Sequence, residues 1–348
     1  MAYGTVNVDN LISSDGGVIS PNINSLRNRI INGAMVIDQR NAGASVTATS
    51  DGQYTLDRWK VGLTVSSKFS VQQSSTAPAG FSNSLLVTSL SAYSVGSGDT
   101  FLFQQNIEGF NTADLSFGTA NAKTVTLSFQ VYSSLTGTFG GSLINSAANR
   151  SYPFSYTVSS ANTWTQISIT IAGDTSGTWV GATNGIGLGV RFGLGSGSSF
   201  SGTAGAWATG NIVQPTSTVS VVGTNGATFY VTGVQLEKGS TATSFDYRPY
   251  GTELQLCQRY YEVLSYNTSE GFCALSAVMP AGSNNRFQWS FKVTKRAAST
   301  VALASGSWVN ATPTIYGGID FADFVNTSTY FYASGTAGNP ALSSSAEL

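Results

Sequence analysis

Aromatic side chains are numerous in this sequence and are suited to binding other molecules. The 348 residues include six Trp, 15 Tyr and 19 Phe, but no His. Without His, Ser-His-Asp and Cys-His nucleophile systems are excluded, and so are His-built zinc or iron sites. Aromatic faces combined with Asn, Gln, Ser and Asp hydrogen-bonding groups are typical of sites for neutral polyhydroxyl ligands, which need no net charge.

Four aromatic residues are candidates for such a site. Trp179 precedes the loop-like stretch Val-Gly-Ala-Thr-Asn-Gly, and Trp207 lies in the Gly-rich region 193–210. Tyr330 and Tyr332 are candidates for a distal patch. The alternative is that each of these aromatics is buried in the core or in a subunit contact. For Trp59 and Trp164, which lie within strand-like patterns, we predict that alternative.

Acidic residues are few and scattered, which disfavours an enzyme. A glycosidase needs two carboxylates about 5–10 Å apart. The pairs available by sequence are Asp320 with Asp323 and Asp246 with Glu253, but acids at strand ends are usually solvated turn residues. Asp174, in its Gly-Asp turn, is a weak candidate for a calcium ligand, since most such turns bind nothing. We therefore predict a non-enzymatic protein without a cofactor.

Charge and targeting signals exclude further classes. Lys and Arg number 16 and Asp and Glu 17, giving a net charge of −1, so nucleic-acid binding is not expected. The N-terminus lacks a signal peptide, and no run of about 18 apolar residues predicts membrane insertion. Cys257 and Cys273 suit assembly in a reducing cytoplasm, although a single bridge between them stays open. We interpret the basic segment 292–296 as a solvated strand edge.

The elements that must position these residues are predominantly strands. Apolar and polar residues alternate over 125–131, 164–171, 229–236 and 287–293, with Gly, Ser and Asn turns between the runs. The Gly-rich run 185–197 has no GxGxxG spacing and reads as a strand with one apolar face. The pattern predicts an all-β fold, a sandwich or barrel.

Helical periodicity is scarce. It favours one helix over 253–261, where Leu254, Cys257 and Tyr261 share a face, and a possible turn of helix over 25–30. We divide the chain into a lead segment (1–30), a large β domain (31–250), and a short helix with a smaller C-terminal β domain (251–348).

The order of these pieces resembles a known family of folds. The large region resembles the jelly-roll β-sandwich of carbohydrate-binding modules as it occurs in tail-fibre-type proteins of tailed bacteriophages. In that family an opening Asn-Gly strand and a closing Val-Gln-Leu-Glu strand bracket the sandwich. The resemblance rests on Asn32-Gly33, Tyr54-Thr-Leu-Asp-Arg-Trp59, Phe103-Gln-Gln-Asn-Ile-Glu-Gly109, Val234-Gln-Leu-Glu237, Tyr247-Arg-Pro-Tyr250 and Leu256-Cys-Gln-Arg-Tyr-Tyr261.

The resemblance implies a virion protein. It implies a homotrimeric tail fibre on the phage particle, assembled in the host cytoplasm, that adheres to a glycan of the host surface. The lead segment resembles the start of virion appendages, which implies that Val6, Val8, Leu11 and Ile12 attach the chain to other virion proteins. The ending Ala346-Glu-Leu348 resembles the ends of phage fibre chains, so a natural C-terminus is expected. The alternative is a structural head fibre or capsid decoration protein without receptor binding.

Overall fold

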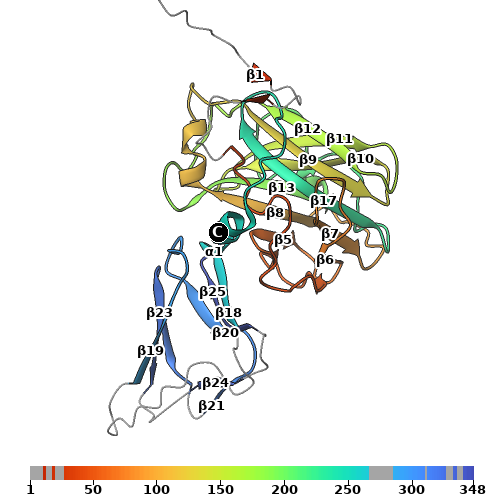
Figure 1. Cartoon of the computed structure of the whole chain (residues 1–348). Helices are drawn as coiled ribbons and strands as arrows, with labels where there is room; N and C mark the ends of the chain where they lie inside the picture. Colours follow the sequence, from red (N-terminus) through yellow and green to blue (C-terminus); the bar gives the residue numbers. More distant parts are fainter. Residues whose placement is uncertain are drawn as a thin grey trace, which may run out of the picture.

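The structure, a computed structural model, consists almost wholly of β-strands. It describes residues 27–265, 285–309, 312–326, 332–334 and 340–348, and the backbone of strands β1 (Leu11–Ile12) and β2 (Val18–Ile19). Two large antiparallel sheets face each other, and one α-helix separates them in sequence from the C-terminal strands (Figure 1). The predicted all-β sandwich is confirmed.

The sandwich has the topology of a jelly roll. Its larger sheet has seven strands in the order β15-β11-β10-β13-β8-β5-β4, and the facing sheet has six, in the order β12-β9-β17-β7-β6-β3. The chain crosses repeatedly between the sheets, for example from β7 to β8 and on to β9. The seven strands are Tyr54–Leu56 (β4), Trp59–Leu63 (β5), Thr100–Glu108 (β8), Gly137–Ile144 (β10), Arg150–Val158 (β11), Ile186–Ser196 (β13) and Ala208–Thr209 (β15). The six are Val46–Thr47 (β3), Phe69–Ser74 (β6), Ser84–Ser89 (β7), Val125–Ser133 (β9), Thr165–Ile171 (β12) and Thr228–Lys238 (β17).

Alternation of residue type sets which side of each strand is buried. On β9, Leu127, Phe129 and Val131 are fully buried between the sheets, whereas Gln130 and Tyr132 point to the other side. The period-two prediction for this strand is therefore confirmed. Stacked aromatic rings fill the core, as for Phe103 and Phe192, whose centroids lie 4.9 Å apart.

The Gly-rich strand β13 has the predicted apolar face. Leu188, Val190 and Phe192 are buried in the core. Its glycine side lets other atoms approach closely, because a Cβ on Gly187 would lie 2.8 Å from the Cα of Gly109.

Short elements between the long strands complete the sandwich. Ser201–Gly202 (β14) pairs in parallel with Gln214–Pro215 (β16). Three 3₁₀ helices, Gly109–Asn111, Ala113–Leu115 and Ser198–Phe200, lie in the connections.

The opening and closing motifs of the sandwich lie side by side. The Gly33 carbonyl accepts a hydrogen bond from the Val234 N–H at 2.9 Å. The side chain of Asn32 donates to the Ile37 carbonyl and accepts from the Ile37 N–H, which fixes the turn after Gly33. Trp59 donates its indole N–H to the Asn32 carbonyl at 3.1 Å. These contacts explain why the Asn-Gly and Val-Gln-Leu-Glu motifs occur together.

The lead segment meets the sandwich through its last residues. Asn28 donates to the Val234 carbonyl at 3.0 Å, and Ile30 is buried in the main core. Residues 28–30 therefore pack as part of the sandwich. Leu11 and Ile12 form β1, which pairs with β2, whereas Val6 and Val8 lie outside the described residues. The predicted role of this segment in virion attachment stays a prediction.

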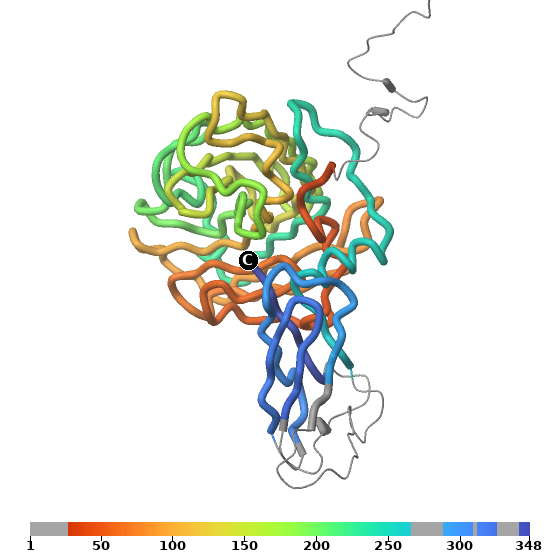
Figure 2. The backbone as a smooth tube through the Cα atoms, turned by 90° about the vertical axis from the view of Figure 1, so that its left-hand side faces the viewer, coloured from red at the N-terminus to blue at the C-terminus, as the bar shows by residue number. Residues whose placement is uncertain are grey.

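Helix α1 (Tyr250–Gln258) lies between the sandwich and the C-terminal strands (Figures 1 and 2). It begins and ends three residues before the predicted bounds, because Pro249 caps it and Tyr261 already pairs with Ser345. Within the described part of the chain it is too short and too polar to span a membrane.

The C-terminal strands form small antiparallel sheets that project from one end of the sandwich (Figure 2). Their orders are β18-β25-β20, β19-β23-β22 and β21-β24. The strands are Tyr261–Ser265 (β18), Asn285–Ser290 (β19), Thr300–Leu303 (β20), Ser307–Val309 (β21), Thr314–Gly317 (β22), Phe321–Asn326 (β23), Tyr332–Ser334 (β24) and Pro340–Ser345 (β25). Division of the chain into segments 1–30, 31–250 and 251–348 stays a prediction.

The basic segment 292–296 is not the solvated strand edge that we predicted. Strand β19 ends at Ser290, and Lys295 is only 2% exposed. Its ammonium group lies 2.7 Å from a carboxylate oxygen of Glu262 and donates to the Gln258 carbonyl at 2.6 Å. Lys295 is buried because it neutralises a carboxylate that is itself fully buried.

Candidate functional site

The outer face of the six-stranded sheet presents a stripe of uncharged polar side chains. Gln130 of β9 lies opposite Gln166 of β12, and Ser128 lies opposite Ser168. The amide of Gln130 donates a hydrogen bond to the Gln166 side-chain oxygen. Because alternate residues of these strands fill the core, these four must face away from it. We call them the polar stripe.

An aromatic group borders one end of the polar stripe. Tyr132 on β9, Trp164 just before β12 and Tyr230 on β17 lie together, with the Tyr132 ring 5.4 Å from Trp164 and 5.0 Å from Tyr230. All three are half-buried and lie outside the main hydrophobic core. We call them the outer aromatic cluster. Trp59 is fully buried as predicted, whereas Trp164 is not a core residue.

A second aromatic group lies beside the polar stripe, over strand β17. The rings of Phe81, Phe245 and Tyr247 lie 4.8–5.4 Å from one another. The Phe81 ring fits over Gly233, which has a φ of +62°, and a Cβ there would lie 2.6 Å from the ring. Tyr247 is 56% exposed and donates its hydroxyl proton to the Gly80 carbonyl. We call these residues the three-ring cluster.

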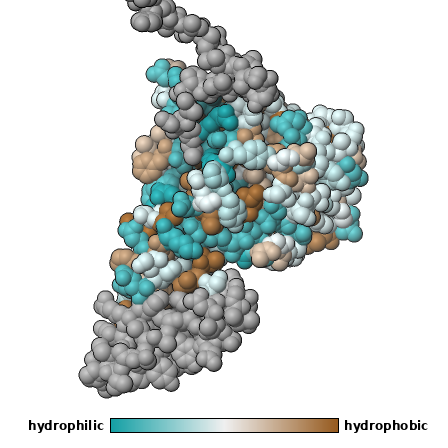
Figure 3. Space-filling model, in the orientation of Figure 1, coloured by the Kyte–Doolittle hydropathy of each residue, from teal (hydrophilic) through white to brown (hydrophobic). Residues whose placement is uncertain are grey.

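A cleft of about 470 Å³ joins the polar stripe to the three-ring cluster. No residue that lines it carries a formal charge. The face of the sandwich that Figure 3 shows is a mosaic of hydrophilic and near-neutral residues with small, separate hydrophobic areas. The lining residues are Phe81, Ser128, Gln130, Gln166, Ser168, Gly233, Ala242, Thr243, Ser244, Phe245 and Tyr247. We call it the strand-face cleft.

A buried carboxylate fixes the loop that forms one wall of the strand-face cleft. Glu237, 2% exposed, accepts from the Thr243 N–H at 2.9 Å and from the Thr243 hydroxyl at 2.7 Å. Gln235 donates to the same carboxylate at 2.9 Å. Charge-assisted hydrogen bonds of this kind are stronger than neutral ones. The wall is therefore held in place before any ligand arrives.

A second cavity, of about 450 Å³, lies on the other side of the three-ring cluster, where helix α1 begins. Asp246 and Glu253, one of the acid pairs noted in the sequence, both line it. Glu253 is already neutralised by Arg248, 3.0 Å away, and also accepts the Asn32 N–H. Its oxygens are thus occupied, which does not suit a catalytic carboxylate. We call this the helix-end cavity.

Trp179 and Trp207 lie together, away from the strand-face cleft. Their rings are 5.4 Å apart, and each packs on Phe117. Trp207 donates to the Ala172 carbonyl at 2.7 Å, and Trp179 to that of Ser176 at 3.1 Å. Both are half-buried against the main core, and the cavity beside Trp179 holds only about 50 Å³. The structure therefore brings these two candidates together but gives them little space for a ligand.

The structure describes some of the remaining candidates and not others. Tyr332 begins β24, whereas Tyr330 lies outside the described residues. Cys257 is a buried free thiol, and Cys273 lies outside the described residues. Asp320 accepts from Thr294 at 2.7 Å, and Asp323 lies opposite Gln288 in the β19–β23 ladder.

Asp174 forms an ion pair with Arg150. Its two carboxylate oxygens accept from the Arg150 guanidinium at 2.7 and 2.8 Å, so this buried acid is the counter-charge of Arg150 and is not free to serve as a calcium ligand. In the part of the chain that the structure describes, no three Cys, Asp or Glu side chains cluster as metal ligands.

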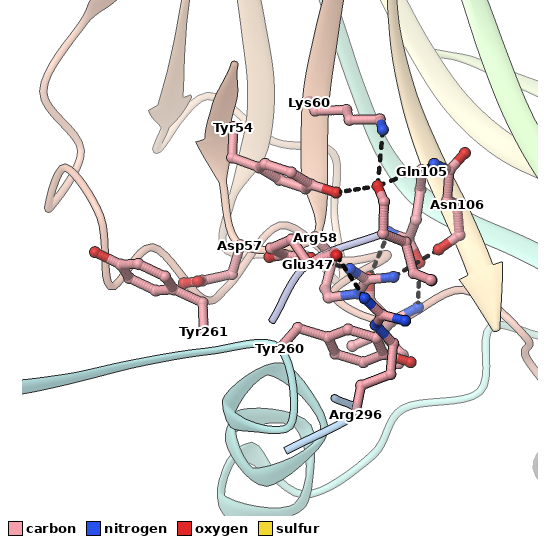
Figure 4. A network of polar contacts seen from close by, with 12 residues as sticks. Tyr54, Asp57, Arg58, Lys60, Gln105, Asn106, Tyr260, Tyr261, Arg296 and Glu347 are labelled. Atoms are coloured by element: carbon pink, nitrogen blue, oxygen red, sulfur yellow. Dashed lines mark hydrogen bonds and ion pairs between the residues drawn. The ribbon is translucent and has the colours of Figure 1, made fainter. Parts of the chain in front are cut away.

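A network of polar contacts joins the C-terminal segment to the sandwich (Figure 4). Glu347 forms ion pairs with Arg58 and, at 2.8 Å, with Arg40. The Arg58 guanidinium stacks on the Tyr260 ring, 3.5 Å from its centroid. The Leu348 backbone oxygen accepts hydrogen bonds from Tyr54, Lys60 and Asn106. Burial and the Glu347 charge raise the pKa of Tyr54. Because its charged groups are paired with one another, this network stabilises the junction.

Asp57 in the same network predicts a pH dependence of stability. Burial raises its pKa from 3.8 to about 7, against the weaker effect of Arg40, 3.8 Å away. Between about pH 4 and 7 the folded state therefore binds more protons than the unfolded state. As pH rises through this window, ionisation of Asp57 lowers the free energy of unfolding by up to ~4 kcal/mol. We expect Asp57→Asn, which can still accept the Gln39 N–H, to gain stability relative to the original protein from pH 5 to 8. Urea unfolding at several pH values measures this difference; a difference independent of pH would contradict it.

Comparisons with known proteins give structural neighbours only. No family model matches the sequence, and no curated protein matches it. The enzymatically active domain of tailspike protein 4 from bacteriophage CBA120 aligns with 61% of this chain at 14% identity and a TM-score of 0.33, but the chain spans only 21% of that protein. TmCBM61 in complex with β-1,4-galactotriose aligns at 9% identity over 61% of this chain and 99% of its own, with a TM-score of 0.31. The CBM22-1 xylan-binding domain from Paenibacillus barcinonensis aligns at 9% identity over 58% and 99%, with a TM-score of 0.29. We therefore argue function from this chain's own residues.

Sequence reasoning missed the residues of the strand-face cleft. The polar positions of the alternating runs, such as Gln130 and Gln166, could have indicated this face. The residues of a strand that do not fill the core must line the opposite face of the sheet. Tyr247 was visible in the Tyr-Arg-Pro-Tyr motif, but nothing local indicated that it meets Phe81, which is 166 positions earlier in the chain.

Proposed function

We propose that this chain binds a neutral glycan in the strand-face cleft. The observation that carries the proposal is an uncharged groove of amide and hydroxyl groups that the three-ring cluster lines, with the outer aromatic cluster farther along the same face. Amides and hydroxyls both donate and accept hydrogen bonds, as sugar hydroxyls do, and ring faces pack against the C–H faces of pyranoses. A charged ligand would find no counter-charge among the lining residues.

The length of the face suits an oligosaccharide. From Ser128 to Tyr132 the strand advances four residues, or about 13 Å. The rigid sheet and the loop anchored by Glu237 pre-organise the groove, so little conformational entropy is lost on binding. Each site is expected to bind weakly, because the cleft is open and each hydrogen bond replaces one to water.

We further propose that the chain is a tail fibre of a tailed bacteriophage that adheres to a host surface glycan. The order of its sequence motifs supports this role, with residues 1–30 attaching the chain to other virion proteins. As a homotrimer it would present three sites, and once one is bound the others bind at a high effective concentration. We propose that the site binds without catalysis, since Arg248 neutralises Glu253, one of the two acids of the nearest pair, which leaves a single carboxylate, Asp246.

Removing both amides of the polar stripe tests the site. We expect the double variant Gln130→Ala with Gln166→Ala to bind neutral oligosaccharides about tenfold more weakly, since each lost hydrogen bond contributes roughly 0.5–1.5 kcal/mol. A glycan array followed by calorimetry on the best ligand measures the change. Gln53→Ala, an amide in a loop at the other sheet, is the matched control and should leave the Kd unchanged. Equal affinity of the double variant and the control would contradict the proposed site.

The virion role has its own test. Purified protein in excess should block adsorption of the parent phage to host cells, and the double variant should block less. A folded oligomer that neither blocks adsorption nor binds the cells would favour the alternative, a structural head fibre or capsid decoration protein.

A further inference from the structure

The helix-end cavity continues the strand-face cleft but differs from it in chemistry. Both are bounded by Phe81, Phe245 and Tyr247, so a ligand on the polar stripe reaches the cavity by passing the three-ring cluster. The cleft is lined by amides and hydroxyls. The cavity instead has apolar walls, formed by Ala34, Val36 and the rings of the three-ring cluster, with Tyr250 at its edge.

Of the three charged side chains that line the helix-end cavity, Asp246 has no counter-charge among the described residues. Glu253 and Arg248 pair with each other at 3.0 Å, and both are more than 90% buried. Asp246 forms no ion pair in the described part of the chain; one of its oxygens accepts the Asn28 N–H at 3.2 Å. An ionised carboxylate only accepts hydrogen bonds, so the partner that Asp246 would bind must be a donor.

The cavity therefore requires a group that combines an N–H or O–H donor with an apolar end. A bare sugar hydroxyl supplies the donor but leaves the apolar wall of Val36 and Ala34 uncovered. An acetamido group supplies both, because its N–H can donate to Asp246 while its methyl group packs against the apolar wall. A free amino group would be attracted by the carboxylate but has no apolar end.

We propose that the helix-end cavity binds an N-acetylamino sugar at one end of the glycan held in the strand-face cleft. This inference rests on the proposed function and specifies the ligand class of that site. The cavity volume of about 450 Å³ accommodates one sugar residue with its substituent. Tyr250, 63% exposed, covers the residue from the solvent side.

Three trisaccharides that differ only at C2 test the inference on the full-length protein. They are the β-1,4-linked trimers of N-acetylglucosamine, glucose and glucosamine, with binding followed by ligand-observed NMR and calorimetry. We expect the N-acetylated trimer to bind at least tenfold more tightly than the other two. Ala34→Leu, which fills the cavity, and Tyr250→Ala should reduce that preference to less than threefold. Tyr316→Ala, a tyrosine of similar exposure (61%) on β22, is the matched control and should retain it.

The outcomes separate this inference from the proposed function. Equal binding of the three trimers, tighter binding of the glucosamine trimer, or a preference unchanged by Ala34→Leu and Tyr250→Ala would overturn the acetamido site. So would failure of the N-acetylated trimer to bind while other neutral glycans still depend on Gln130 and Gln166. If no glycan binding depends on those two glutamines, the proposed function itself fails.

Discussion

Replacing Lys295 with methionine is expected to destabilise the folded protein by about 3–5 kcal/mol. The substitution leaves Glu262 charged and fully buried without its cation, which lies 2.7 Å away in the original protein. Burial lowers the pKa of Lys295, whereas Glu262 favours its charged form. The lost hydrogen bond to the Gln258 carbonyl adds to the cost.

A second substitution distinguishes loss of the pair from loss of packing. Lys295→Met combined with Glu262→Leu removes both charges, and we expect it to recover most of the lost stability, because a buried pair can often be replaced by apolar groups at little cost. Urea unfolding followed by tryptophan fluorescence measures both variants. A loss below 1 kcal/mol for the single variant, or no recovery in the double, would show that Lys295 is not the essential counter-charge.

Replacing Arg58 with methionine should have a comparable effect, about 3–5 kcal/mol. Arg58 is 1% exposed, pairs with Glu347 and donates to the Asn106 carbonyl at 2.5 Å. Its loss would also weaken the attachment of the C-terminal segment, because among the described residues Arg40 would be the remaining cation paired with the Glu347 carboxylate. Accordingly, limited proteolysis should cut the C-terminal region faster in this variant than in the original protein.

An exposed ion pair provides the comparison for Arg58. Arg29 lies 2.9 Å from Asp114, whose side chain is 46% exposed. Because water screens such pairs, Arg29→Met should cost about 1 kcal/mol or less. If the two arginine variants lost equal stability and showed equal protease sensitivity, the junction network would not be what holds the C-terminal segment in place.

Local patterns in the sequence were sufficient to predict the all-β fold class. The alternation over 125–131 and 229–236 predicts β9 and β17 because the alternation of apolar and polar residues is a local property of the chain. The resemblance implied that the Asn32-Gly33 and Val234-Gln-Leu-Glu237 motifs bracket one sandwich, and the structure adds that Gly33 and Val234 are hydrogen-bonded. The sandwich was therefore predictable, including the motifs that open and close it.

The candidate site was not predictable in the same way, because distant parts of the chain form it. The three-ring cluster brings Phe81 together with Phe245 and Tyr247, and the bulge at Gly233 makes room for it. Trp164 was assigned to the core because it adjoins a strand pattern, but it is out of phase with the core-facing Ile167 and Ile169 and therefore lies on the opposite face. Lys295 was assigned to a solvated edge because its partner Glu262, 33 residues away, is invisible to local pattern.

The most direct test of glycan binding in the strand-face cleft compares two tryptophans. Trp164→Ala removes a ring of the outer aromatic cluster, and Trp207→Ala removes a similarly half-buried ring beside Trp179. Calorimetric titration of both variants with the best ligand from the glycan array gives their Kd values, and circular dichroism confirms their folding. We predict at least a tenfold weaker Kd for Trp164→Ala and an unchanged Kd for Trp207→Ala. An unchanged Kd for Trp164→Ala with weakened binding in Trp207→Ala would contradict the account and place the site at Trp179 and Trp207.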